Sequence, residues 1–303
     1  MSRADARSPL MPQMLMLAMI AIWGASFAAI KAALNASVPE MALIAGRFWL
    51  AIVAMLPFLP SGYRLASLAA TWRRGCITGF ALLMGYLLQT YGMQETTSSV
   101  GSFMTGLIVL LVALGARFVF GERMPRAKVL GLALGFCGLC MICLGATNNE
   151  TGTSSLRGIL LQVGSSTCYA AHVLLISRLS PRGKATAFCW WQLAVVAVGA
   201  SCLVPVTGGL GPIETYIQNP TVWLNLGYLG LLATALGIGV QSSMQPRIHP
   251  SQVAVLFATQ PAFGALAGVL LLGDSLGAWE WLGGGVIVAS VVIASRGDQV
   301  VAK

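Results

Sequence analysis

Charged residues are scarce in this chain of 303 residues, and their scarcity excludes several classes of protein. Only 9% of the residues are Asp, Glu, Lys or Arg, whereas 57% are hydrophobic and the mean hydropathy is +0.80. A soluble globular domain has about 25% charged residues, so the chain is not of that class. A membrane span takes about 20 apolar residues, which leaves room for ten spans but for no separate soluble domain.

Other absences exclude particular chemistries. Apart from Glu280, near the start of the last run, the apolar runs contain no Asp or Glu, and the only histidines are His172 and His249. An intramembrane hydrolase needs a nucleophile with an oriented base, or a metal cluster, so this class is disfavoured. The 18 Lys and Arg residues form no basic patch, and the seven cysteines lie in or beside apolar runs. We therefore expect no nucleic-acid partner, no disulfide framework, no metal and no cofactor.

Ten continuous apolar runs are present instead. They cover about residues 14–34, 41–59, 75–94, 98–120, 127–145, 158–177, 186–206, 221–243, 251–272 and 278–295. Continuous runs predict helices, whereas a porin-like barrel would show short alternating segments. The first run is too long for the apolar part of a signal peptide and is interpreted as the first helix. The sequence thus predicts an all-α integral membrane protein with ten transmembrane helices.

The basic residues between the runs predict the orientation. Every Lys or Arg outside the runs, except Arg157, falls in the two termini or in an even-numbered connector. Because Lys and Arg are enriched in cytoplasmic loops, both termini are predicted to be cytoplasmic. An even number of spans is required for that arrangement, and ten satisfies it.

An internal repeat divides the chain into two halves. Gly121-Glu122-Arg123 in the first half recurs as Gly273-Asp274-Ser275 in the second. The halves, 14–145 and 158–296, hold five runs each, and an odd number of spans gives them opposite orientations. Inverted repeats are typical of secondary transporters, whose substrate site lies near the membrane midplane between the repeats.

Several short motifs resemble a known family. Trp23-Gly24-Ala25-Ser26-Phe27 with Lys31 resembles the opening signature of the EamA branch of the drug/metabolite transporter (DMT) superfamily. Later matches are Pro39, Arg47-Phe48, the turn at Gly121 and Pro261 followed by Leu272-Gly273-Asp274. Asp274-Ser275 departs from the family, which usually has Glu-Arg there. The resemblance implies a ten-helix exporter of amino acids or similar small metabolites in the inner membrane.

Two cations are predicted within the membrane without a counter-ion. Lys31 and Arg47 lie at similar depths on the first two helices, where a charge is costly unless it meets water or a partner. Since no intramembrane carboxylate neutralises them, they would suit a carboxylate or phosphate on the substrate. The alternative is that both side chains extend to the membrane surface or pair with Glu40 or Glu95.

Aromatic and polar residues at helical spacing complete the predicted cavity, since aromatic walls with a few polar groups are usual for small ligands. Taken singly, most of them are also explained by helix packing or by anchoring at the membrane surface. Pro261, in the middle of the ninth helix, is predicted to be a gate or hinge, or else a static bend. The predicted substrate-binding residues are Trp23, Phe27, Lys31, Arg47, Tyr86, Gln89, Ser102, Tyr169, His172, Gln241 and Gln260.

The predicted function is export of amino acids by alternating access, with aromatic ones favoured by the aromatic residues of this set. The chain is not expected to be an enzyme. A carrier of phosphorylated metabolites or nucleotide sugars is the alternative, and a channel is disfavoured. Energy coupling stays open between downhill export and proton antiport through His172, Glu95 or the substrate itself. The expected partners are a small-molecule substrate and the lipid bilayer, and the chain is expected to be a monomer, with a dimer through the glycine-rich fifth and tenth helices as the alternative.

Overall fold

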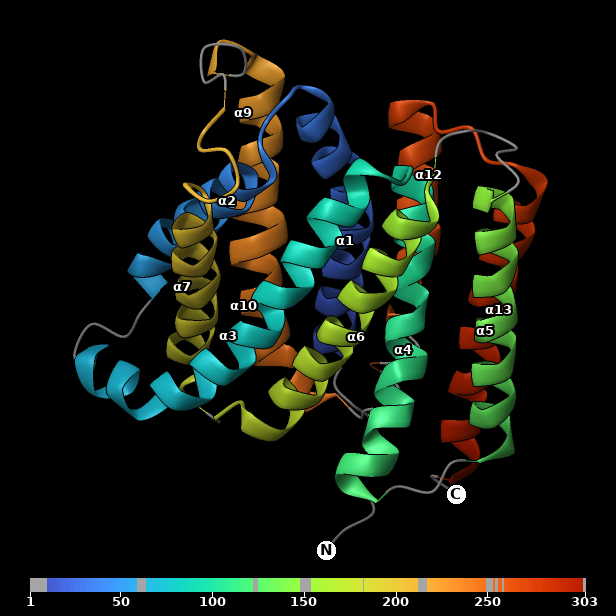
Figure 1. Ribbon diagram of the computed structural model, residues 1–303. Coiled ribbons are helices and arrows are strands. Elements are labelled where there is room, and N and C mark those ends of the chain that lie inside the picture. The colour runs from blue at the N-terminus through green and yellow to red at the C-terminus, as the bar shows by residue number, and fades with distance from the viewer. Residues whose placement is uncertain are drawn as a thin grey trace, which may run out of the picture.

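The computed structural model describes residues 10–58, 64–121, 125–147, 154–181, 183–211, 217–248, 253, 256–257 and 259–301, and within them the chain is helical with no strand (Figure 1). The α-helices are α1 (Leu10–Asn35), α2 (Glu40–Met55), α3 (Arg64–Gln94), α4 (Ser98–Phe120), α5 (Arg126–Thr147), α6 (Leu156–Leu179), α7 (Ala185–Leu203), α9 (Pro220–Gly227), α10 (Gly237–Met244), α12 (Gln260–Leu272) and α13 (Ala278–Val301). The other described helical segments are the short 3₁₀ turns η1 (Leu56–Phe58) and η3 (Gln245–Arg247) and the π-helix η2 (Tyr228–Leu236).

Seven helical segments of the described chain are long and apolar enough to cross a membrane. They are Leu10–Asn35, Glu40–Phe58, Ala66–Gln94, Ser98–Phe118, Leu156–Leu179, Ala185–Leu203 and Pro220–Arg247. Three shorter apolar helices are Val129–Gly145, Gln260–Leu272 and Ala278–Ile293. Each apolar run of the sequence overlaps one of these segments, and the all-helical membrane character predicted from the composition is confirmed.

Two segments differ from their apolar runs. The run that predicts the third helix begins at residue 75, but α3 begins at Arg64 and carries the exposed Arg73 and Arg74 within it. Helix formation therefore continues past the apolar part, since Arg is a good helix former. The run over 221–243 is divided into α9, η2 and α10, and a π-helix within an α-helix often marks a functional position.

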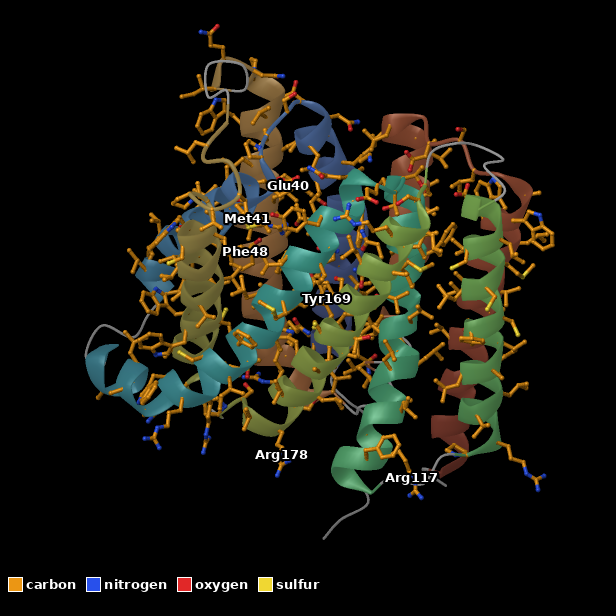
Figure 2. All side chains as sticks on the ribbon, in the orientation of Figure 1. Glu40, Met41, Phe48, Arg117, Tyr169 and Arg178 are labelled. Atoms are coloured by element: carbon orange, nitrogen blue, oxygen red, sulfur yellow. The ribbon has the colours of Figure 1, made fainter. Side chains whose placement is uncertain are left out.

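The two ends of the helix bundle carry opposite charges. Arg117 and Arg178, near the last residues of α4 and α6, lie at one end, which we call the basic end, and Glu40 lies toward the other (Figure 2). Glu95 and Asp274 also lie at that other end, because Glu95 contacts the start of α6 and Asp274 contacts the start of α4. We call it the acidic end.

The glycine at the start of the repeated turn predicted from the sequence has the same conformation in both halves. Gly121 ends α4 and Gly273 ends α12, each with φ of 67°. This left-handed conformation is the usual helix C-cap, and glycine adopts it without steric cost.

Close packing of small residues and hydrogen bonds between helices hold the bundle together. A Cβ atom on Gly24 of α1 would lie 2.7 Å from the Cβ of Phe263 on α12, so only glycine allows these helices to approach this closely. Ser165 of α6 donates to the carbonyl of Gly85 on α3 at 2.9 Å. Such contacts are the main source of helix association in membranes, where the lipid is as apolar as the helices. Helices α5 and α13 pack against each other along one flank (Figure 1).

Candidate functional site

A cavity of about 70 Å³ lies in the middle of the bundle, among α1, α3, α4, α6, α10 and the start of α12. Sites that enclose a drug-sized ligand measure about 300–1,000 Å³, so such a ligand requires the cavity to widen. Its lining residues are Trp23, Ser26, Phe27, Leu82, Tyr86, Gln89, Thr105, Ile108, Tyr169, His172, Val173, Ile238, Gln241, Phe257 and Gln260. Eight of the predicted substrate-binding residues are among them, and Lys31, Arg47 and Ser102 are not.

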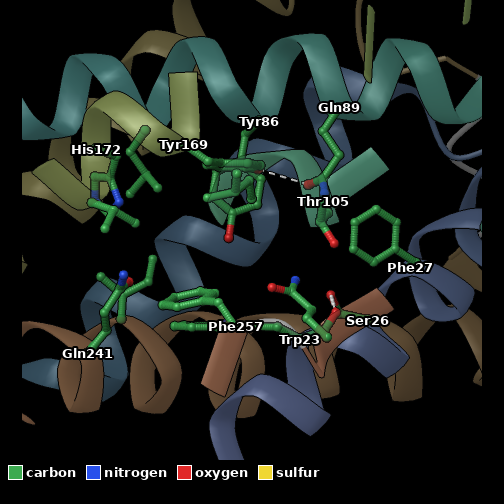
Figure 3. Close-up of a pocket in the computed structure, with 15 residues that line it drawn as sticks. Trp23, Ser26, Phe27, Tyr86, Gln89, Thr105, Tyr169, His172, Gln241 and Phe257 are labelled. Atoms are coloured by element: carbon green, nitrogen blue, oxygen red, sulfur yellow. Dashed lines mark hydrogen bonds between the residues drawn. The ribbon is translucent and has the colours of Figure 1, made fainter. Parts of the chain in front are cut away.

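Two pairs of aromatic rings face each other across the cavity (Figure 3). Trp23 and Phe257 stack with their ring centroids 6.0 Å apart and an interplanar angle of 17°. On the opposite side, Tyr86 and Tyr169 meet edge to face at 5.6 Å. The Trp23 indole N–H donates to the Ala233 carbonyl at 2.6 Å, which fixes the orientation of this ring. A planar apolar group can therefore be held between two preformed aromatic walls.

Most polar groups around the cavity are already hydrogen bonded within the protein. The Tyr169 hydroxyl donates to Oε1 of Gln89 at 2.9 Å, and Nε2 of Gln241 donates to Oε1 of Gln245 at 2.9 Å. Within the described part of the chain, the Tyr86 hydroxyl and the Gln260 side-chain amide have no such partner, and both residues line the cavity. Both groups are available to a ligand without breaking an existing bond.

His172 lines the cavity and is fixed by a neighbouring amide. Its Nε2 atom lies 2.8 Å from Oε1 of Gln192, whose Nε2 in turn donates to Phe188 and Ser242. Since the amide oxygen can only accept, Nε2 of His172 carries the hydrogen and donates it. In the neutral ring, Nδ1 is then left as an acceptor.

Ser102 and Pro261 join two helices beside the cavity. The Ser102 hydroxyl donates to the Pro261 carbonyl at 3.1 Å, linking α4 to α12. Pro261 was expected in the middle of a helix, but it lies in the first turn of α12 as described, where the missing N–H of proline leaves no helical bond unmade. Its proposed role as a gate or hinge stays a prediction.

Lys31 binds backbone carbonyls at the acidic end. Its ammonium donates to the carbonyls of Met93 at 2.7 Å, Gln94 at 3.3 Å and Thr96 at 2.8 Å. These carbonyls lie at the C-terminus of α3, where the helix dipole favours a cation. The three donors of Lys31 are therefore occupied outside the cavity.

Glu95 pairs with neither of the predicted cations. Its Oε1 accepts from Arg157 at 2.6 Å, and its Oε2 accepts from the Ser155 hydroxyl at 2.6 Å. The Arg157 side chain is 79% exposed, so this ion pair lies at the membrane surface and joins the end of α3 to the start of α6.

Arg47 is buried behind the Tyr86 ring. Only 2% of the residue is exposed, and its Nε donates to the Thr234 hydroxyl at 3.0 Å. Its Nη2 lies 3.5 Å from the Leu229 carbonyl in the π-helix η2. The guanidinium carbon lies 4.8 Å from the Tyr86 ring centroid, within the range of a cation–π contact.

Sequence reasoning missed seven lining residues. Ser26, Leu82, Thr105, Ile108, Val173, Ile238 and Phe257 line the cavity but were not predicted. Thr105 was detectable, because it is one turn beyond the predicted Ser102 on the same polar strip. The apolar lining residues could not be detected from the sequence, because their side chains resemble those that face lipid. Among the described residues, no group of His, Cys, Asp or Glu could hold a metal ion.

Comparison with known proteins identifies the family. The model of the EamA-like transporter family matches residues 10–144 and again residues 156–296. The chain belongs to the EamA-like transporter family. This EamA-like transporter is 28% identical to an uncharacterized transporter of Archaeoglobus fulgidus, over 92% of the chain and 84% of the relative.

Other relatives carry more specific names. A protein of Salmonella typhimurium named a probable amino-acid metabolite efflux pump is 25% identical over 94% of this chain and 95% of its own. An uncharacterized inner membrane transporter of Escherichia coli is 26% identical over 93% of this chain and 90% of its own. Together with the apolar helices, they show that this EamA-like transporter is a multi-pass protein of the inner membrane.

A solved structure shares the fold. A crystal structure superposes on this chain with a TM-score of 0.67 and 18% sequence identity. The matched region covers 94% of this chain and 97% of the chain in the crystal structure. At that identity the likeness concerns the fold of this EamA-like transporter and not its substrate.

Proposed function

We propose that this EamA-like transporter exports amino acids, aromatic ones preferentially, or similar small metabolites through the central cavity. The observation that carries the proposal is the pair of aromatic walls, Trp23 with Phe257 and Tyr86 with Tyr169. The aromatic walls favour a planar ring, and the available Tyr86 hydroxyl and Gln260 amide can bond its polar substituents. The name of the Salmonella relative supports amino acids as the class.

We further infer ten membrane spans arranged as two inverted repeats, with the basic end and both termini in the cytoplasm. The packing supports a two-fold relation, because α1 packs against α12 and α10 while α6 packs against α4 and α3. A Cβ atom on Gly237 of α10 would lie 2.6 Å from the Trp23 ring, and one on Gly85 of α3 would lie 2.6 Å from the Tyr169 ring. Each half thus supplies one aromatic residue and one glycine to the same kind of contact.

Alternating access then requires the acidic end to open. Lys31 and Asp274 hold the two helix ends on either side of the connection between α3 and α4. Lys31 binds the Met93 carbonyl at the end of α3, and Asp274 Oδ2 accepts from the Ser99 N–H and from the Ser99 hydroxyl, each at 2.8 Å, at the start of α4. We interpret these contacts as the closed form of the outer gate. Their release would give the cavity access to the outside.

The test is counterflow in liposomes that contain purified protein and unlabelled L-tryptophan. Labelled tryptophan should accumulate, and Trp23→Ala should reduce the initial rate at least about tenfold, because losing one aromatic contact and its buried area costs more than about 1.4 kcal/mol. Trp223→Ala is the matched control, because Trp223 is 52% exposed and lies outside the cavity. No counterflow of any amino acid by folded protein would refute the proposed substrate class, and phosphorylated metabolites would be tested next.

A further inference from the structure

The Arg47 guanidinium carries a buried charge that no acidic group neutralises within the described residues. Its polar contacts are the Thr234 hydroxyl and the Leu229 carbonyl, and its guanidinium also lies near the Phe48 and Tyr86 rings. Glu40 is on the same helix, seven residues away, or about 10 Å along the axis. A buried charge of this kind is costly, and in membrane proteins it is usually retained for a function.

The Tyr86 ring separates this charge from the cavity. The Arg47 guanidinium lies 4.8 Å from the ring centroid, and Tyr86 lines the cavity, with its hydroxyl directed into it (Figure 3). No charged side chain lines the cavity in the described part of the chain. Arg47 therefore sets the electrostatic potential of the cavity, although it does not touch a molecule inside it.

The charge is confined to one half of the protein. Counted from the first residues of the two helices, Gln192 of α7 is at the same position as Arg47 of α2, and its amide is engaged by His172. Lys31, the other predicted cation, is bound to carbonyls at the acidic end. Arg47 is thus the cation placed directly behind the wall of the cavity, and its contribution to the potential can be removed by a single substitution.

We propose that Arg47 determines the charge selectivity of the cavity by acting across the Tyr86 ring: it favours substrates with an anionic group and disfavours cationic ones. The inference rests on the proposed transport function. A carboxylate in contact with Tyr86 would lie about 8 Å from the guanidinium, the sum of 4.8 Å and a contact distance of about 3.5 Å. At an effective dielectric constant of about 20, that separation changes affinity about 30-fold for each unit of ligand charge.

The test compares three ligands that share an indole ring and differ in charge: indole-3-acetate, indole-3-acetamide and tryptamine. Their inhibition constants against labelled tryptophan counterflow are measured, and their binding to purified protein is measured separately from the shift in melting temperature. Wild-type protein should bind the anion most tightly, then the neutral amide, then the cation, with steps of about 30-fold.

Two variants remove the charge in different ways. Arg47→Gln deletes it, and Thr234→Asp keeps Arg47 but places a carboxylate where the Thr234 hydroxyl now accepts from it. Both should bring the three affinities to within about threefold of one another. Thr234→Asp also guards against the case in which Arg47→Gln does not fold. Arg47→Lys retains the charge and should retain the order of the three ligand affinities. Arg74→Gln, which removes an exposed arginine that does not line the cavity, should retain this order as well.

The outcomes separate the inference from the proposed function. Equal affinities in wild-type protein, or an unchanged order in a folded charge-neutralised variant, would overturn the inference, including when tryptophan is transported. If Arg47 contributed to stability alone, the variants would have a lower melting temperature but would bind the three ligands in the same order of affinity as the wild-type protein. If the order is found by binding but tryptophan is not carried, the proposed substrate is refuted and the charge selectivity stands.

Discussion

Replacing Lys31 with Met should loosen the acidic end of the bundle. The Lys31 ammonium makes three hydrogen bonds, to the carbonyls of the last two residues of α3 and of Thr96 just beyond it, at 2.7, 3.3 and 2.8 Å. A hydrogen bond to a charged group contributes about 1.5–3 kcal/mol. Because this region is partly exposed, water can replace part of the contribution, and we expect a net loss of about 2 kcal/mol for the closed form. That loss corresponds to an increase of about 30-fold in the open population.

Hydrogen–deuterium exchange measures this opening directly. Where exchange follows the opening equilibrium, the amides of residues 93–101 should exchange about 30-fold faster in Lys31→Met. Lys184→Met is the matched control, because Lys184 is an exposed lysine at the other end of the bundle. Equal protection of residues 93–101 in wild type and Lys31→Met would show that the three hydrogen bonds do not hold the gate, and would restore the prediction that Lys31 binds substrate.

Three further predictions follow from particular contacts. Gly24→Ala should lower the melting temperature in detergent by several degrees, because its Cβ would meet α12 at 2.7 Å, whereas Gly285→Ala, with nothing within 4 Å, should leave it unchanged. Tyr169→Phe should reduce counterflow severalfold without loss of stability beyond about 1.5 kcal/mol, since it frees Gln89 Oε1 from one hydrogen bond; an unaltered rate would exclude a role of the Tyr169 hydroxyl in transport. Glu95→Gln should change the melting temperature by less than about 2 °C, because its ion pair is exposed, and a larger fall would mean that the pair is part of the gate.

The sequence was sufficient to predict the membrane class and the location of the helices. Long apolar runs separated by basic connectors leave few alternatives, because only helices and closed barrels satisfy their backbone in lipid. Helical spacing also brought Trp23 and Phe27 to one face, and both line the cavity. The register of η2 could not be predicted, because a π-turn has no marker in a uniformly apolar stretch such as Tyr228–Leu236.

The cations show where sequence reasoning reached its limit. Their similar depth in the outer part of the membrane stays a prediction, and depth does not determine the direction of a side chain. Lys31 has a flexible side chain that reaches the carbonyls of α3, and Arg47 is turned toward η2 by Thr234. Both acceptors lie more than 60 residues away in sequence, so only the tertiary structure reveals them. Phe257 was missed for a similar reason, since its stacking partner is Trp23 on another helix.

The π-helix also limits how the length of this chain can change. Residues of an α-helix advance by about 100° each, so the wide turn of η2 sets the rotation of every residue that follows it in α10. One residue deleted from the α-helical turns of α9 would rotate Ile238 and Gln241 by about 100°, away from the cavity that they line. A residue deleted from η2 can be absorbed, because its wide turn holds more residues than an α-helical turn does. Apolar side chains within this stretch can replace one another at small cost, as long as the rotation of α10 is kept. Here the spacing of the chain, rather than the identity of its residues, carries the information that builds the wall of the cavity.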